Sequence, residues 1–179
     1  KLIEVEYEVL PAVTDLRAAM KDGAPLVHPG TTTVSLGKDT GKASNITKHF
    51  RMQQGDPDAA FAKADVIVER DYVTSTVHQG YIEPTNATAM WNRDGLITVW
   101  TSTQGAFNAR DSTAMILGVP VSRVRCVPQE IGGGFGGKIN VYLEPVAAIL
   151  SRESGRPVKV IMSRAEVFQA TGPGPASWT

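Results

Sequence analysis

The residues of this chain with the clearest chemical potential lie in one short glycine-rich stretch. Residues 131–140 read Ile-Gly-Gly-Gly-Phe-Gly-Gly-Lys-Ile-Asn, with five glycines in six consecutive positions. Glycine loses the most backbone freedom on folding, so such a run is usually found where the backbone approaches another group closely or adopts a positive φ. An apolar stretch precedes the run and a helix-like stretch follows it. Free N–H groups in that setting can hold an anion or a cofactor.

The run satisfies two common nucleotide-binding patterns, but the residues around it fit neither. The pattern G-x-G-x-x-G needs an acidic residue at the end of the next strand, about 20 residues on. Glu153 lies near that distance, but at a predicted helix end. The phosphate loop G-x-x-x-x-G-K needs a Ser or Thr after the lysine to bind Mg²⁺, whereas Ile139 follows Lys138 here. A stand-alone nucleotide-binding module therefore stays only as an alternative, and a non-catalytic structural remnant is another.

A longer pattern is more specific. The segment 129–138 resembles the glycine-rich segment of the molybdenum hydroxylases, the xanthine dehydrogenase and aldehyde oxidase family, in the large subunit that binds molybdopterin. The triplet 102–104, Ser-Thr-Gln, matches a second family motif upstream, and 155–159, Gly-Arg-Pro-Val-Lys, matches a third. The resemblance covers most of the chain, up to Phe168. Three motifs in order are stronger support than the glycines alone.

The resemblance assigns roles to individual residues. By position, Gln104 matches the glutamine whose amide hydrogen-bonds an oxygen ligand of the metal, and Phe135 matches the residue whose backbone N–H contacts the same centre. Gly133, Gly134 and Gly136 would let the loop approach the cofactor. Both Gln104 and Phe135 would act around the molybdenum without ligating it directly. The family's general base lies beyond residue 179, so no catalytic residue is expected within this chain.

Ile139 departs from the pattern of one subgroup. Members that oxidise purines carry a glutamate directly after the Gly-Gly-Lys, where it binds the substrate ring. An isoleucine cannot pair with a purine edge, so xanthine is disfavoured. The resemblance then favours an apolar wall in the substrate pocket, as in members that act on aldehydes, with carbon monoxide and aromatic or heterocyclic substrates left open.

The resemblance also implies cofactors and partners. The enzyme would carry molybdenum on molybdopterin, expected in its cytosine dinucleotide form, with iron–sulfur clusters and FAD on partner subunits or domains. It would insert oxygen derived from water into a C–H bond of an aldehyde or an aromatic or heterocyclic substrate. The family's large subunit is several times longer, and this sequence opens mid-pattern without an initiator methionine. We therefore expect an internal piece that is inactive without the rest of the large subunit.

The elements that position these residues mix strands and helices without strict alternation, which predicts an α+β fold of mixed sheets with flanking helices. Strands are predicted at 2–9, 66–77, 86–91, 96–101, 123–127 and 157–162. Helices are predicted at 15–20 and from 56, capped by Asp15 and Asp56, and from 163, where Ser163 and Glu166 would form a capping box. Two longer helices are predicted at 105–117 and 144–153, stopped by Gly118 and Gly155. Apolar residues predict a buried face on each of the two longer helices, formed by Phe107, Ala114 and Leu117 on the first and by Val146, Ile149 and Leu150 on the second.

By resemblance the chain divides into three parts. Residues 1–22 would end a small mixed α/β domain, 23–55 would form an exposed connecting segment, and 56–179 would form the first part of the molybdopterin-binding domain. The connecting segment is rich in Gly, Thr, Ser and Lys, and His28 and His49 within it are predicted to be solvated.

The Asp94-Gly95 turn signal predicts that the strands 86–91 and 96–101 form a hairpin. Two further polar residues lie before this predicted hairpin. His78 and Glu83 could suggest a metal site or acid–base chemistry, but no third ligand is near and Pro84 predicts a turn. A structural role is the preferred interpretation of this segment.

Composition argues against several classes of function. Lys plus Arg and Asp plus Glu number 18 each, so the formal net charge is zero, which argues against a nucleic-acid or acidic-lipid surface. No apolar run approaches membrane-spanning length. The single cysteine, Cys126, excludes an internal disulfide or a cysteine metal cage, and its apolar neighbours predict a small buried side chain. A reduced, cytoplasmic setting fits this composition.

Overall fold

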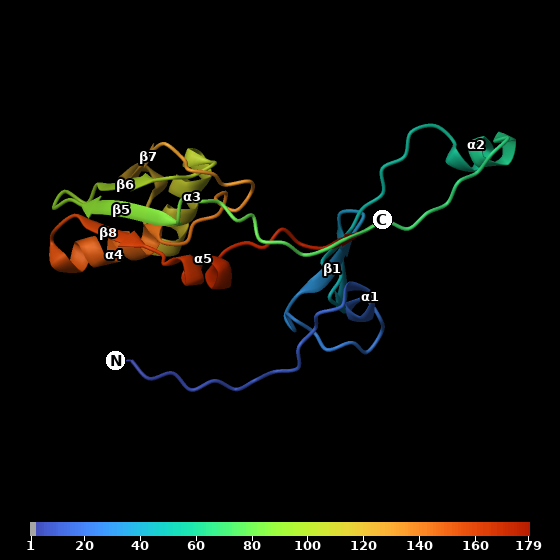
Figure 1. Ribbon diagram of the computed structural model, residues 1–179, viewed down its shortest axis with the longest axis horizontal. Helices are drawn as coiled ribbons and strands as arrows, with labels where there is room; N and C mark the ends of the chain where they lie inside the picture. The colour runs from blue at the N-terminus through green and yellow to red at the C-terminus, as the bar shows by residue number, and fades with distance from the viewer. Residues whose placement is uncertain (1–2) are drawn as a thin grey trace. The chain divides into compact units, whose positions relative to one another are not determined.

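The computed structural model describes residues 3–179, and the chain divides into two compact units between Arg70 and Asp71 (Figure 1). The first unit contains two short helices and a three-stranded sheet. The helices are α1 (Leu16–Ala19) and α2 (Pro57–Lys63), and the strands are β1 (Thr32–Ser35), β2 (Lys38–Ala43) and β3 (Lys48–His49). The sheet has the order β2-β1-β3, with β1 antiparallel to β2 and parallel to β3.

Both helices of the first unit begin where their capping residues predict. The carboxylate of Asp15 accepts a hydrogen bond from the N–H of Ala18 at 2.6 Å, and that of Asp56 accepts one from Ala59 at 3.0 Å. These bonds satisfy backbone donors that a helix start leaves without partners. Capping signals in the sequence therefore locate both helices.

One sequence prediction for the first unit is wrong and another is incomplete. The segment 23–55, expected as an exposed connection, contains the whole three-stranded sheet, and its connecting role stays a prediction. Residues 3–9 form no strand, and Leu2 lies outside the described residues. The side chains of β2 are exposed along its whole length, so the apolar alternation by which strands are recognised is absent from the sheet that does form.

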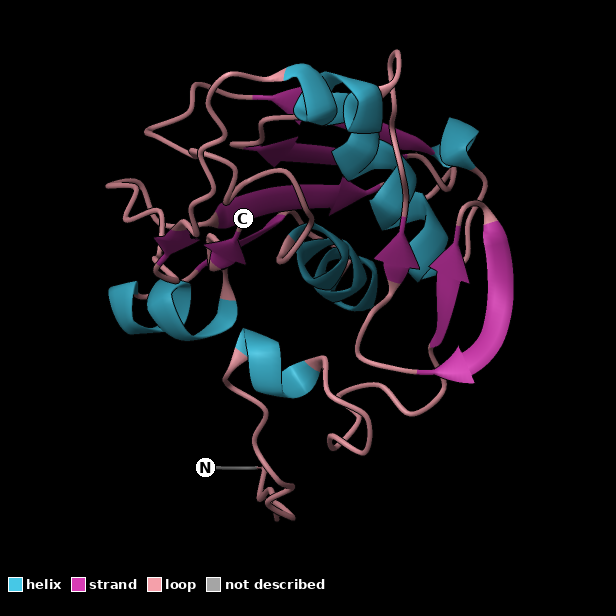
Figure 2. Ribbon diagram, turned by 90° about the vertical axis from the view of Figure 1, so that its right-hand side faces the viewer, coloured by secondary structure: helices cyan, strands magenta, loops and turns pink. Residues whose placement is uncertain are grey.

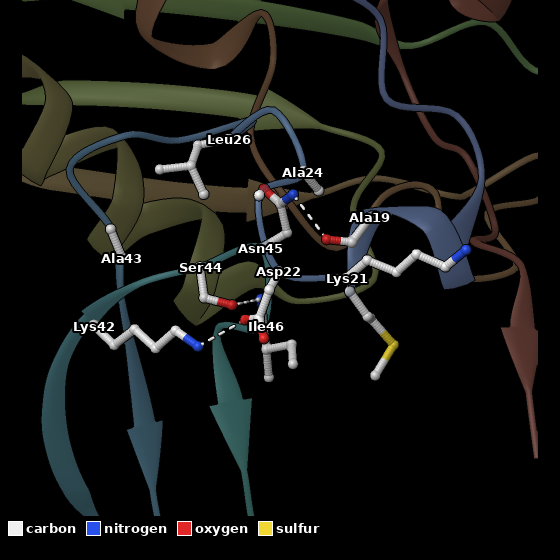
Figure 3. Close-up of a pocket in the computed structure, with 12 residues that line it drawn as sticks. Ala19, Lys21, Asp22, Ala24, Leu26, Lys42, Ala43, Ser44, Asn45 and Ile46 are labelled. Atoms are coloured by element: carbon white, nitrogen blue, oxygen red, sulfur yellow. Dashed lines mark hydrogen bonds and ion pairs between the residues drawn. The ribbon is translucent and has the colours of Figure 1, made fainter.

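A small cavity of about 120 Å³ lies in the first unit beside α1 (Figure 3). Asn45 organises its wall: its side-chain nitrogen donates to the carbonyl oxygens of Ala19 and Pro25, both at 3.0 Å, and its side-chain oxygen accepts from the N–H of Val27 at 2.9 Å. One amide thus joins three chain segments. None of the residues predicted for the cofactor site lines this cavity.

The second unit is built on a four-stranded mixed sheet of order β7-β6-β5-β8 (Figure 2). Its strands are β5 (Asn86–Trp91), β6 (Ile97–Thr101), β7 (Val124–Pro128) and β8 (Val158–Ile161). The hairpin β5–β6 is antiparallel, as predicted, and β8 pairs antiparallel with the other edge of β5. Strand β7 is parallel to β6, and the helix α3 (Ala106–Leu117) connects them, as a parallel pair requires. The predicted α+β class is confirmed.

The core lies between this sheet and the helices α3 and α4 (Glu144–Ser154). It consists mainly of small and β-branched residues: Ala87, Ala89, Ile97, Val99, Ala114, Val124, Ala147 and Ala148. Both helices end at a glycine with positive φ, Gly118 and Gly155, as predicted. The unit also contains a 3₁₀ turn (Val121–Arg123), the helix α5 (Arg164–Ala170) and the short strand pair β4 (Val73–Thr74) and β9 (Ser177–Trp178).

The predicted buried faces of α3 and α4 are largely wrong. Phe107 is 75% exposed, and the side chains that α3 buries are the small Ala109, Thr113 and Ala114. On α4 the predicted stripe of Val146, Ile149 and Leu150 is 40–45% exposed, whereas Ala147, Ala148 and Ser151 are buried. Because α4 packs closely on β5, small residues fit the interface and large apolar ones do not.

Two more predictions concern single elements. The capping box at the start of α5 is confirmed, with Ser163 and Glu166 each accepting a hydrogen bond from the other's N–H. The strand predicted over 66–77 is reduced to β4. None of the helices within residues 3–179 has the length and apolar character of a membrane span.

Candidate functional site

The glycine-rich loop joins β7 to α4 and is closed by a tight turn. The N–H of Gly137 donates to the carbonyl oxygen of Gly134 at 2.7 Å. The two residues between them, Phe135 and Gly136, have φ of +50° and +92°, a sign pattern that type I′ turns require. A left-handed conformation in a residue as bulky as phenylalanine costs roughly 1–3 kcal/mol and persists only where the surroundings enforce it. Phe135 is also 74% exposed, so burial of its ring does not explain the position.

Three of the glycines are required by the protein's own side chains. A Cβ atom on Gly132 would lie 2.5 Å from Cβ of Glu83, one on Gly134 would lie 2.6 Å from Oε1 of Gln104, and one on Gly137 would lie 2.7 Å from the ring of Tyr81. No side chain fits at such distances. The loop is therefore bare partly because three neighbouring side chains press against it.

Gln104 holds the loop through its side-chain oxygen. Oε1 accepts hydrogen bonds from the N–H of Gly136 at 2.9 Å and from that of Lys138 at 3.1 Å, and the N–H of Gln104 donates to the carbonyl oxygen of Lys138 at 3.0 Å. Two incoming N–H donors identify this atom as the oxygen of the amide, so the other atom is the NH₂ donor. Within the described part of the chain, that NH₂ group has no hydrogen-bond partner.

A group of backbone donors accompanies this amide. The N–H groups of Gly133, Gly134 and Phe135 make no hydrogen bond to any residue from 3 to 179. Successive N–H groups in a turn with left-handed residues form a concave site for an anion or an oxygen ligand. The side chain of Gln104 and the predicted loop residues thus come together, and they offer neutral donors.

An ion pair fixes the two ends of the loop. Oε2 of Glu83 accepts a hydrogen bond from the N–H of Gly132 at 2.8 Å and another from Nζ of Lys138 at 2.6 Å. The Lys138 side chain is 1% exposed and that of Glu83 is 27% exposed. Burial alone would raise the pKa of Glu83, but the hydrogen bonds from Lys138 and Gly132 and the charge of Lys138 lower that pKa overall. The carboxylate is therefore ionised at neutral pH and serves the loop.

A buried polar cluster around Tyr81 packs against the same loop. The ring of Tyr81 is 1% exposed and lies 4.8 Å from Nζ of Lys138, and its hydroxyl is 2.8 Å from Oγ1 of Thr171 and 3.1 Å from that of Thr85. Nδ1 of His78 accepts from the N–H of Gly80 at 3.0 Å, so the opposite ring nitrogen is the donor. These contacts agree with the structural role expected for the segment from His78 to Glu83.

Ile139 lies directly after the loop. Its side chain is 47% exposed, and its carbonyl oxygen accepts a hydrogen bond from Nδ2 of Asn108 at 2.8 Å. Sequence reasoning missed Asn108, which lies in the first turn of α3, shortly after Gln104 and the N-cap Gly105. It also left Lys138 without a role, although a lysine within a glycine loop next to apolar residues needs a nearby acid if it is buried. Among residues 3–179, no group of three metal-binding side chains comes together.

Comparison with known proteins decides the family. Residues 39–179 match the molybdopterin cofactor-binding domain. The chain belongs to this family. The resemblance to the molybdopterin-binding large subunits of the molybdenum hydroxylases, seen in the sequence, is thereby confirmed.

The relatives are larger than this chain. The nicotinate dehydrogenase large molybdopterin subunit of Eubacterium barkeri is 32% identical over 164 residues, which are 92% of this chain and 36% of the relative. The xanthine dehydrogenase molybdenum-binding subunit of Escherichia coli O157:H7 is 34% identical over 172 residues, 96% of this chain and 21% of the relative. The CO dehydrogenase of Oligotropha carboxidovorans superposes with a TM-score of 0.74 at 30% identity, over 97% of this chain and 22% of that one. The chain thus spans about a fifth to a third of these relatives.

Proposed function

We propose that this chain holds the oxygen ligands of a molybdenum cofactor through Gln104 and the loop of Gly133, Gly134, Phe135 and Gly136. The observation that carries the proposal is the orientation of Gln104. Its oxygen is engaged by the loop, so its NH₂ group is left as a donor beside the free N–H groups of Gly133 to Phe135. Such a donor set fits a polyanionic cofactor with oxygen ligands, because neutral donors satisfy oxygen without adding charge.

The division of labour follows from these contacts. When bound, the cofactor supplies the redox chemistry that inserts water-derived oxygen into a substrate C–H bond. Gln104 and the N–H of Phe135 would bind and orient its oxygen ligands, and neither would ligate the metal. The loop's own hydrogen bonds fix these donors in advance, so little reorganisation accompanies binding. The general base would come from another part of the polypeptide, and the isolated chain would not turn over substrate.

Ile139 supports the choice of substrate class. Its half-exposed side chain follows the donor loop directly and offers no hydrogen bond, so it would form an apolar wall of the substrate pocket. The relatives are named for nicotinate, xanthine and carbon monoxide, so their names leave the substrate open. An aldehyde or an apolar aromatic or heterocyclic compound fits an isoleucine better than a purine does, because a purine edge would face it without a partner.

The remaining assignments rest on the family. We infer the cytosine dinucleotide form of molybdopterin, iron–sulfur and FAD partners, and a cytoplasmic enzyme. We also infer that residues 1–22 end a preceding small domain, that 23–55 lead out of it and that 56–179 begin the cofactor domain.

Native protein tests these proposals directly. An antibody against this segment would recover the polypeptide that carries it, and its mass, molybdenum content and acid-released nucleotide would be measured together. We expect a large subunit with roughly one molybdenum and one CMP per chain, and with iron and flavin in the complex. A polypeptide of about 19.2 kDa without molybdenum would overturn the proposal.

A further inference from the structure

We propose that Glu83 and Lys138 form a positioning pair that sets the donor geometry of Gln104 and the glycine loop. This inference rests on the proposed function of that loop. Neither residue touches the proposed cofactor donors with its own charged group. Their effect would pass through Lys138, whose backbone is part of the loop that Gln104 holds.

The first step is the place where the pair acts. A single carboxylate oxygen of Glu83 binds both the N–H of Gly132 and Nζ of Lys138, at 2.8 and 2.6 Å. The N–H of Glu83 also donates to the carbonyl oxygen of Gly132 at 3.1 Å. Gly132 and Lys138 are the two ends of the glycine loop. Oε2 of Glu83 therefore links both ends of the loop and fixes the distance between them.

The second step is the link to Gln104. Lys138 is held at its side chain by Glu83, at its N–H by Oε1 of Gln104 and at its carbonyl oxygen by the N–H of Gln104. A displacement of Lys138 would break the bond from its N–H to Oε1 of Gln104 and the bond from the N–H of Gln104 to its carbonyl oxygen. Only the bond from the N–H of Gly136 would then orient the side-chain amide. The direction of the free NH₂ group thus depends on a charge pair that it does not contact.

The third step is the energetic character of the pair. The ammonium is buried, with Oγ of Ser102 at 3.3 Å and the Tyr81 ring at 4.8 Å as its further contacts. Removing two charges from water costs about as much as their attraction returns, so buried pairs add little net stability compared with apolar residues. The contribution of this pair is instead a fixed distance between Glu83 and Lys138, because both groups must stay within hydrogen-bond reach.

The test uses the full-length enzyme with three variants: Glu83→Gln, Lys138→Met and the double variant. Glutamine keeps an acceptor for Gly132 but removes the negative charge, and methionine keeps the stem of Lys138 but removes the positive one. Two signals report the donor geometry: hydrogen–deuterium exchange of peptides covering 131–139, and the Mo(V) electron paramagnetic resonance spectrum after dithionite reduction. We expect at least tenfold faster exchange and altered g-values in both single variants.

Two comparisons separate positioning from stability. The double variant leaves no unpaired buried charge, so it should fold at least as well as the single variants and still show the altered spectrum and fast exchange. The core variant Ile97→Val in β6 should lower the melting temperature and leave both signals unchanged. A double variant with wild-type exchange and a wild-type spectrum would overturn the inference. If wild-type enzyme bound no molybdenum, the proposed function would fail, and loop exchange alone would still decide whether the pair positions the loop.

Discussion

Under the proposed function, the single side chain of Gln104 would serve both the protein and a ligand. Its oxygen accepts from Gly136 and Lys138, and this use of the oxygen decides which way the NH₂ group faces. An amide is suited to this because its two ends have opposite hydrogen-bonding character. The loop and the ligand would therefore not compete for Gln104, since each would use a different atom of its amide.

Gln104→Glu separates these two uses. A carboxylate keeps an oxygen for the N–H groups of Gly136 and Lys138 but offers no donor to an oxygen ligand. Because hydrogen bonds to charged groups contribute roughly 1.5–3 kcal/mol, we expect cofactor affinity to fall by about 10- to 100-fold. Molybdenum retained by the full-length enzyme after gel filtration measures this loss, and exchange of the 131–139 peptides should stay near wild type.

Gln129→Glu is the matched control for that variant, because the Gln129 side chain makes only long contacts of 3.3–3.4 Å to neighbouring carbonyls. Equal molybdenum retention in the two variants would contradict the role of Gln104.

Cys126 in β7 is expected to be chemically inert. Its side chain is only partly buried, not fully buried as predicted. This partial burial, with the nearby charge of Glu144, raises its pKa to about 11 against the opposing effect of Arg110. The thiolate is the reactive form, so alkylation by iodoacetamide at pH 8.5 should be roughly 100-fold slower than for a free cysteine with a pKa near 8.5. Mass spectrometry of the native protein and of protein in urea measures both rates. Equal rates in the two conditions would mean that the strand does not protect the thiol.

At the scale of elements, capping residues predict where helices begin, and the Asp94-Gly95 turn signal predicts the hairpin. Asp15, Asp56 and Ser163 each cap the helix that the sequence assigns to them. The sheet of the first unit was not predictable, because β2 is exposed throughout and lacks apolar alternation. The buried face of α4 was predicted from large apolar residues, whereas the close approach of β5 selects Ala147 and Ala148. Tertiary packing decides which face of a helix is buried, and the periodicity of a single sequence does not reveal that packing.

The candidate site also has a part that the sequence predicts and a part that only the fold reveals. The motif predicts Gln104 and the loop, because spacing along the chain is visible in a sequence. The ion pair joins residues 55 positions apart, and the contact of Asn108 with Ile139 spans 31. Contacts at such separations follow from the fold, so the sequence gives only their chemical types.

Ser151 is predicted to hold α4 to the end of β5. It is fully buried; its hydroxyl accepts from the N–H of Trp91 at 2.9 Å and donates to the carbonyl oxygen of Arg156 at 2.7 Å. Ser151→Ala would leave both backbone groups without this partner, at a cost of about 1–3 kcal/mol. We expect faster hydrogen exchange in β5 and in the turn after α4 of the full-length protein.

Ser154→Ala provides the comparison, since the exposed Ser154 hydroxyl only bonds carbonyl oxygens of its own helix and the following turn. The prediction fails if both variants exchange alike in β5.

At the scale of the whole molecule, the pH dependence of stability should carry a term from the loop. The sequence has equal numbers of acidic and basic residues, so no large net charge dominates near neutrality. Exposed carboxylates such as Asp22 and Glu166 also have lowered pKa values, through Lys42 and Ser163 respectively. Their screened, solvent-exposed positions make Glu83 the carboxylate of most interest.

The difference in melting temperature between wild type and Glu83→Gln isolates this term in the full-length protein. Desolvation opposes, but the bonds from Lys138 and Gly132 outweigh it, so the pKa of Glu83 is lower in the folded state than in the unfolded one. A group with a lowered folded pKa stabilises the fold fully above its unfolded pKa, near 4.3, and the stabilisation is lost as the pH falls through the folded value. We therefore expect the wild type to be the more stable protein at pH 7 and the difference to shrink steadily below about pH 4.3, because protonated Glu83 is neutral like the glutamine.

Glu153→Gln, which alters an exposed pair with Arg152, should show a difference near zero at every pH. A difference for Glu83→Gln that stays constant from pH 7 to pH 3 would mean that the ion pair with Lys138 does not form in solution.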